Sequence, residues 1–152
     1  MPTDPSSRQV SDLNPDERDW LEHHRELLAA IVEQEQLDLP EEATILDACD
    51  AVVRWWHAQP ESERPDANMV VNAVGIGLGD AIADVFEMQW RIIEDESGTS
   101  LALWREQPDI VAAPIDSVAK RFADSPNGFV SEFYESLAGD LDQAIDADPQ
   151  QG

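Results

Sequence analysis

The stretch that decides the fold class is Val70-Val71-Asn72-Ala73-Val74-Gly75-Ile76-Gly77-Leu78-Gly79-Asp80. A strand running into a glycine-rich loop would indicate a dinucleotide-binding site in a parallel sheet, with Glu94 and Asp95 near the distance of a ribose-binding acid. The spacing argues against that interpretation, because the third glycine comes one residue early for G-x-G-x-x-G. Residues 80–87 are also too few for a parallel crossover, which needs about a dozen residues or more.

A helix is the better interpretation of the same stretch. Apolar residues recur at helical spacing between residue 66 and about residue 86, at Val70, Val74, Leu78, Ala81 and Val85. Within this helix Gly75, Gly79 and Ala83 are four residues apart and form a flat face for close packing. The glycines are therefore interpreted as packing positions.

After this helix the period changes to that of a sheet. Met88, Trp90 and Ile92 alternate with polar residues, which is typical of a half-buried strand with Trp90 facing the core. Asp95 and Gly98 bound a turn in which Gly98 suits a left-handed conformation. Residues 101–104 then predict the returning strand and 110–113 a third, short strand.

Helices are predicted on both sides of this meander. Asn14-Pro15-Asp16-Glu17 combines an Asn cap, Pro at the first helical position and a Glu three residues after the cap, and Thr44 with Asp47 repeats the capping pattern. Apolar residues from Trp20 to Val32 mark the inner face of the first helix. Two further helices are expected after the meander, over 115–122 and 130–145.

The predicted fold is α+β: two or three N-terminal helices, a short three-stranded antiparallel meander, then two C-terminal helices. Residues 13–146 form one domain, with flexible tails over 1–12 and 147–152.

Charge is the most unusual property of the chain. Thirty-three Asp and Glu against nine Lys and Arg give a net charge of −24. This field disfavours direct binding of nucleic acid or membrane surfaces and attracts a basic partner. The alternative is a solvated coat: over roughly 7,700 Å² of surface the carboxylates would lie about 15 Å apart, beyond the Debye length of ~8 Å. The acids are spread along the chain, which favours the coat.

A cytoplasmic location is expected from three features. The N-terminus lacks the basic and apolar regions of a signal peptide, and no apolar run approaches the roughly 20 residues needed to cross a bilayer. The single cysteine, Cys49, fits a reducing compartment.

Residues for catalysis, cofactors or metals form no convincing set. His23 and Glu26 are one turn apart, but a zinc site needs three or four ligands and the only distant histidine is His57, so both His23 and His24 are interpreted as surface residues. Cys49 lies among acids, which raise a thiol pKa. We therefore predict no catalytic residues, no cofactor and no metal.

Lys120 and Arg121 stand out because basic residues are scarce. The structural interpretation pairs them with Glu94, Asp95 or Glu96 at the hairpin, and the functional alternative is an anion-binding point. Exposed pairs contribute only ~0–1 kcal/mol, so packing must hold these elements together.

A set of motifs resembles the core pattern of an uncharacterised bacterial family, a domain of unknown function, over about half of the chain. The residues that carry the resemblance are Gly75–Asp80, Trp90, Glu94-Asp95-Glu96, Gly98, Leu101-Ala102-Leu103, Pro114 and Lys120-Arg121. The resemblance implies a small α+β module and supplies no reaction, cofactor or catalytic residue.

The leading functional hypothesis is a non-enzymatic regulatory protein that binds another protein with a basic surface, as immunity proteins and antitoxins do. The first alternative is a small enzyme or ligand-binding domain with a site near Gly75–Asp80 and the hairpin. The second is a nucleic-acid mimic, against which the scattered acids argue, because a mimic needs a dense row of charge.

Overall fold

The computed structural model describes residues 8–96 and 98–147. The helices are α1 (Pro15–Gln34), α2 (Ile45–Ala58), the 3-10 helix η2 (Glu61–Glu63), α3 (Ala67–Phe86), α4 (Pro114–Phe122) and α5 (Val130–Asp146). The strands are β1 (Gln9–Ser11), β2 (Gln89–Asp95), β3 (Gly98–Arg105) and β4 (Ile110–Ala112). The predicted α+β class is confirmed; three α-helices precede the β2–β4 meander, where two or three were expected, and two follow it.

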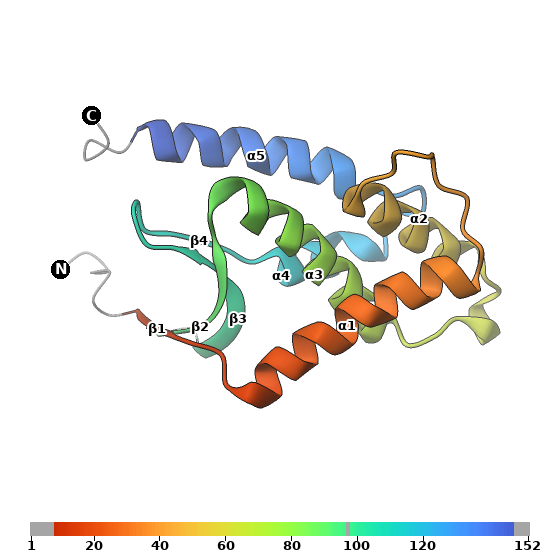
Figure 1. Ribbon diagram of the computed structural model, residues 1–152. Helices are drawn as coiled ribbons and strands as arrows, with labels where there is room; N and C mark the ends of the chain where they lie inside the picture. The colour runs from red at the N-terminus through yellow and green to blue at the C-terminus, as the bar shows by residue number, and fades with distance from the viewer. Residues whose placement is uncertain (1–7, 97, 148–152) are drawn as a thin grey trace.

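Helix α3 lies at the centre of the molecule. It packs against α1, α2, α4 and α5, and its C-terminal end reaches the sheet (Figure 1). Eleven of its residues are buried, all but two of them before residue 80. The middle of the helix, residues 70–79, is therefore covered on nearly all sides, and the solvent faces lie at its two ends, where Asn68 is exposed and Val85 is 59% exposed. The expectation that Val85 continues the inner face is wrong, because α3 leaves the helical layer there.

Helix α3 also corrects the expectation about apolar runs. By length and composition alone it could cross a bilayer. Core helices of soluble proteins can be equally long and apolar, and 61% of an 18-residue stretch of α3 is buried against the rest of the chain. Its apolar composition is explained by these packing contacts.

Both predicted capping boxes are present. The Asn14 side chain accepts a hydrogen bond from the Glu17 backbone N–H at 2.8 Å, and Glu17 accepts one from the Asn14 backbone N–H at 2.7 Å. Thr44 and Asp47 make the same reciprocal pair at the start of α2. Each box satisfies two backbone donors that a helix start leaves unpaired, so local sequence determines where these helices begin.

The sheet has four antiparallel strands in the order β1-β2-β3-β4, so the predicted three-stranded meander is one strand short. The missing strand lies in the segment assigned to a tail: Val10 pairs with Ile93 of β2. Beside it Arg8 forms an ion pair with Asp109, and Arg91 pairs with Asp12. Three residues are too few to show a period of two, so only pairing with β2 reveals this strand. The remainder of both predicted tails, residues 1–7 and 148–152, lies outside the described residues.

The β2–β3 hairpin has the predicted register. Trp90 lies opposite Leu103, and both are buried beneath the helical layer. Gly98 pairs with Asp95 and has a φ of +125°, a conformation that favours glycine. The predicted special conformation of Gly98 is confirmed.

Candidate functional site

The three glycines of α3 are contact points within the core. A Cβ at Gly75 would lie 2.6 Å from the Ile115 backbone of α4, and one at Gly77 would lie 2.7 Å from the Cys49 sulfur of α2. At Gly79 it would overlap the Trp90 indole. These glycines therefore let neighbouring elements approach α3 closely, as the helical interpretation predicts, and their faces are occupied by protein.

Asp80 and Trp90 form one cluster with Gly79. The Asp80 carboxylate accepts hydrogen bonds from the Arg25 guanidinium at 2.8 and 2.9 Å and from the Trp90 indole N–H at 3.0 Å. This pairing with Asp80 raises the pKa of Arg25 above its ordinary value. One carboxylate thus joins α1, α3 and β2, which gives these motif residues a structural role.

The remaining motif residues lie apart from that cluster. Asp95 and Gly98 close the tip of the β2–β3 hairpin. Lys120 pairs with Asp116 of its own helix at 3.0 Å, and the Arg121 guanidinium lies 4.3 Å from the centre of the Phe133 ring of α5. The expected link from these cations to the hairpin is therefore wrong: Lys120 and Arg121 stabilise α4 and its packing on α5. Asp116 lies one helical turn before Lys120, so the ion pair within α4 forms more readily than one to the hairpin.

The histidines and the cysteine also have structural contacts. His24, expected on the surface, is only 6% exposed, and its Nδ1 lies 2.8 Å from the Trp20 carbonyl oxygen. His57 Nε2 lies 2.7 Å from the Phe122 carbonyl oxygen. Burial is the main cause that raises the pKa of the Cys49 thiol, and Asp50 and Asp80 add to the effect. In the described part of the chain, no group of three or more His, Cys, Asp and Glu could hold a metal ion.

Sequence reasoning missed the role of Asp50. Its carboxylate accepts hydrogen bonds from the backbone N–H groups of Phe129, Val130 and Ser131 at 2.9, 2.6 and 3.1 Å. Asp50 of α2 therefore caps the N-terminus of α5, 79 to 81 residues away. Gly128, with a φ of +93°, brings the loop close to Asp50. The only signal in the sequence was a helix start at Phe129 without a local capping residue.

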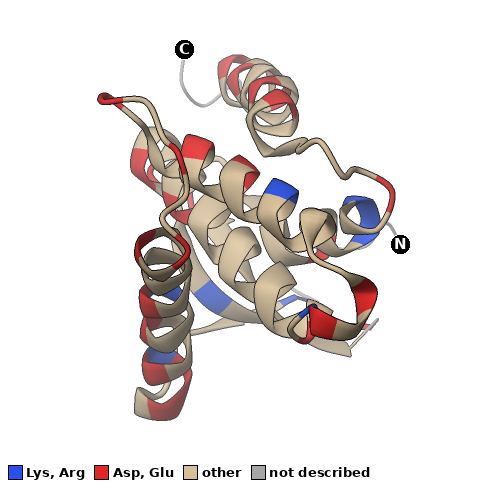
Figure 2. Cartoon of the chain, turned by 90° about the vertical axis from the view of Figure 1, so that its right-hand side faces the viewer, with Lys and Arg blue, Asp and Glu red and all other residues tan. Residues whose placement is uncertain are grey.

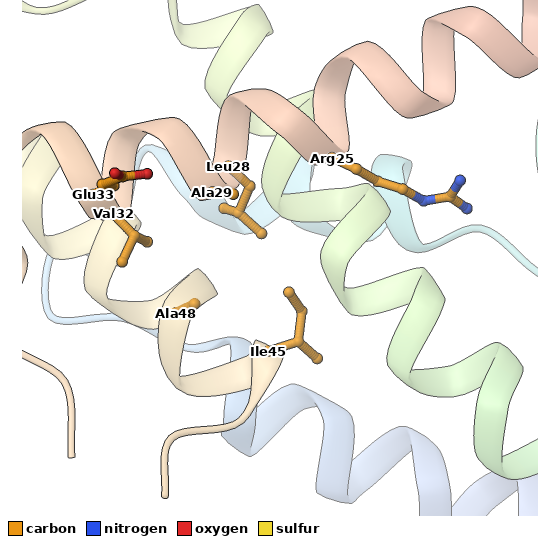
Figure 3. A pocket seen from close by; sticks show the side chains of 7 residues that line it. All are labelled: Arg25, Leu28, Ala29, Val32, Glu33, Ile45 and Ala48. Atoms are coloured by element: carbon orange, nitrogen blue, oxygen red, sulfur yellow. The ribbon is translucent and has the colours of Figure 1, made fainter. Parts of the chain in front are cut away.

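An apolar groove lies on the surface between α1 and α2. It has a volume of about 260 Å³. Its lining residues are Arg25, Leu28, Ala29, Val32, Glu33, Ile45 and Ala48. Figure 3 shows Glu33 at one end and Arg25 at the other, with apolar side chains from both helices between them. Ile45 is 42% exposed, so this groove presents an apolar side chain to solvent.

The charged residues that follow Arg25 along α1 and into α2 are all acidic. Residues 26–49 contain seven Asp and Glu and neither Lys nor Arg. Figure 2 shows few basic residues among the acidic ones on the visible helices. Arg25, the cation at the end of the groove, is bound to Asp80 and Glu22. The acids here are only slightly denser than in the whole chain, seven in 24 residues against 33 in 152, so this segment stands out by its lack of cations.

A second apolar cleft lies where α1 begins to cross the sheet. Its volume is about 210 Å³, and its lining residues are Glu17, Trp20, Ile92 and Leu101. Trp20 was expected on the inner face of α1 but is 38% exposed, because it borders this cleft at the edge of the core.

The comparisons with known proteins identify a family without describing its function. No curated protein and no solved structure matches the chain. The family model for a domain of unknown function matches residues 50–134. The match begins at Asp50, whose carboxylate binds the backbone near the other end of the match, and every residue that lines the α1–α2 groove precedes it. Because the match covers more than half of the chain, the protein belongs to the family described as Domain of unknown function (DUF3806).

Proposed function

We propose that this protein is a non-enzymatic, acidic interaction protein of the cytoplasm, which binds a protein with a basic surface through α1 and the start of α2. The observation that carries the proposal is the apolar groove bordered by an uninterrupted acidic segment. Binding surfaces combine an apolar centre with a polar rim, and opposite charge on the two partners speeds their encounter.

Acids along α1 are spaced closely enough to form a polar rim beside the groove. The exposed surface of 9172 Å² shared among 33 acids gives each about 280 Å², or a spacing of about 17 Å. Glu26 and Glu33 are seven residues apart on α1, which is about 10 Å at 1.5 Å per residue. Glu22 precedes Glu26 by one turn, about 6 Å. Along α1 the carboxylates are therefore closer together than the mean.

The end of α1 carries an unfavourable arrangement of charge. The C-terminus of a helix bears partial negative charge and is stabilised by cations. The last turn of α1 has no basic residue and contains Glu33. Lys or Arg from a partner would relieve this repulsion, so binding should be coupled to local stabilisation of α1.

The other functional hypotheses receive less support. The surfaces of Gly75 and Gly79 are filled by Ile115, Trp90 and Pro114, which argues against a ligand site on that segment. The net charge of −24 opposes direct contact with nucleic acid or anionic lipid. Immunity and antitoxin roles remain the kinds of regulation that fit an acidic protein with a basic partner.

The proposal is tested by affinity capture from native lysate over a salt series. The bait proteins are the wild type, the double variant Glu26→Gln/Glu33→Gln, and the control Glu132→Gln/Glu135→Gln on α5. Each pair removes two exposed helical carboxylates and so changes net charge equally.

We expect one basic protein to be retained by the wild type and the α5 control above physiological salt, and to be lost by the α1 variant. Equal loss from both double variants would show that net charge alone attracts the protein. That result, or the absence of any partner retained above physiological salt, would overturn the proposal.

A further inference from the structure

We propose that the α1–α2 groove receives one face of a basic amphipathic helix from the partner, an inference that rests on the proposed function. Its apolar side chains would occupy the groove between Leu28, Val32 and Ile45, and flanking Lys and Arg would lie against the acids of α1 and of the segment before α2. This is the helix-in-groove mode of recognition, in which apolar anchors recur every three or four residues.

The backbone of the groove favours a helical occupant over an extended one. Both walls are α-helices, whose backbone N–H and C=O groups are already paired within the helix. An extended peptide would find no free strand edge there and would leave its own backbone groups unpaired on an apolar surface. A helix satisfies its own backbone and presents only side chains.

The dimensions of the groove set the number of anchors. Its α1 wall extends from Arg25 to Glu33, about 12 Å at 1.5 Å per residue. That length accommodates two or three apolar side chains from successive turns of a helix. The volume of about 260 Å³ is below the roughly 300–1,000 Å³ of typical small-molecule sites, so a few side chains fit better than a whole ligand.

Charge complementarity selects a basic helix over other occupants. Glu26 and Glu33 are exposed, and within the described residues neither side chain has a hydrogen bond or ion pair. Arg25 is held by Asp80 and offers no free positive charge. A second copy of the protein would bring another net charge of −24 to this acidic face, which opposes self-association.

The test uses two synthetic peptides of about 18 residues, long enough for five helical turns. Both contain the same Leu and Lys residues. One places Leu at i, i+4, i+7 and i+11, and the other distributes the same residues without an apolar stripe. Binding to the full chain is measured by fluorescence anisotropy at about 0.15 M and about 1 M salt, where the Debye length falls from ~8 to ~3 Å.

Matched protein variants locate the binding site. Ala29→Arg places a large charged side chain at the groove, and Ala144→Arg makes the same change on α5. Both alanines are exposed, so both variants should fold, which circular dichroism and the melting temperature will verify. We expect the amphipathic peptide to keep measurable affinity at high salt, and Ala29→Arg to weaken it roughly tenfold or more while Ala144→Arg changes it less than about twofold.

Three outcomes are informative. Equal affinities for the two peptides, or equal effects of the two arginine variants, would overturn the helix-in-groove proposal. A second outcome is that Glu26→Gln/Glu33→Gln still lowers the affinity for both peptides more than Glu132→Gln/Glu135→Gln does. In that case the acidic face of α1 is a binding surface, and only the helical form of its occupant is refuted. If the two double variants bind the peptides with equal affinity, the proposed function fails as well.

Discussion

Replacing Gly79 with alanine tests the central packing contact of the fold. The new Cβ would lie 2.5 Å from Trp90 Cη2, closer still to Cζ2, and 2.9 Å from Pro114 Cγ. The indole is itself held by the hydrogen bond from its N–H to Asp80 at 3.0 Å. It cannot move away without breaking that bond, and α4 begins at Pro114 on the other side.

The expected magnitude follows from three contributions to the free energy of unfolding. Overpacking a core costs about 1–3 kcal/mol. Leaving the indole N–H unpaired costs about 1–3 kcal/mol more. Alanine recovers about 1 kcal/mol through its higher helix propensity. The net loss is therefore about 1–5 kcal/mol, or several degrees in melting temperature for a chain of this length.

Gly139→Ala is the matched control. Gly139 lies within α5 and a Cβ there would meet nothing within 4 Å, so this variant should gain about 0.5–1 kcal/mol. Urea denaturation, monitored by tryptophan fluorescence and by circular dichroism, measures both variants. A double-mutant cycle with Trp90→Phe provides a second check, because phenylalanine lacks the part of the indole that carries Cζ2 and Cη2. Gly79→Ala should cost less in that background.

Stability of Gly79→Ala equal to or above that of the wild type would refute this reasoning. An unchanged cost in the Trp90→Phe background would show that the clash is elsewhere.

Three further predictions concern other elements. Asp50→Ala removes the acceptor for three N–H groups at the start of α5 and should lower the free energy of unfolding, measured by urea denaturation, by about 1–2 kcal/mol. Asp142→Ala, on the exposed face of α5, should change it by less than about 0.5 kcal/mol. Similar values for the two variants would exclude the capping role. Gly98→Val should lower the melting temperature, because valine is strained by about 1–3 kcal/mol at positive φ and no side chain lies nearby to compensate; an unchanged melting temperature would contradict the hairpin geometry. Burial raises the pKa of the Cys49 thiol, so the unfolded chain ionises from its ordinary value of 9.0 while the folded protein stays protonated, and stability should fall as the pH rises above that value, by up to about 1.4 kcal/mol per unit. Cys49→Ala should lack this part of the decline, and identical pH profiles for the two proteins would disprove it.

The position of the groove relative to the family match matters for its interpretation. The matched residues 50–134 include most of α2, then α3, the sheet from β2 to β4, α4 and the start of α5. The α1 wall and the lining residues of α2 lie outside the match. A docking function at the groove is thus a proposal about this chain and not about the family.

Local sequence alone determined the elements whose signals lie within a few residues. The capping boxes of Asn14 and Thr44 fix helix starts because donor and acceptor are three residues apart. The alternation predicts β2 and the burial of Trp90, although farther along the strand Ile93 is buried and Ile92, expected on the inner face, is only half-buried; the glycine spacing of α3 indicates close packing. Each of these signals lies within the element that it predicts or at its boundary, so no information about distant residues is needed.

Only the tertiary structure decided the features that depend on partners far along the chain. Strand β1 exists because β2 offers an edge about 80 residues away, and its three residues carry no pattern of their own. Asp50 caps α5 across a similar separation, and Arg25 meets Asp80 only after α1 packs on α3. The groove is likewise a product of packing, because Val32 and Ile45 border one surface only when α1 and α2 lie side by side. Composition records how many carboxylates the chain carries, but the fold determines which of them surround an apolar surface.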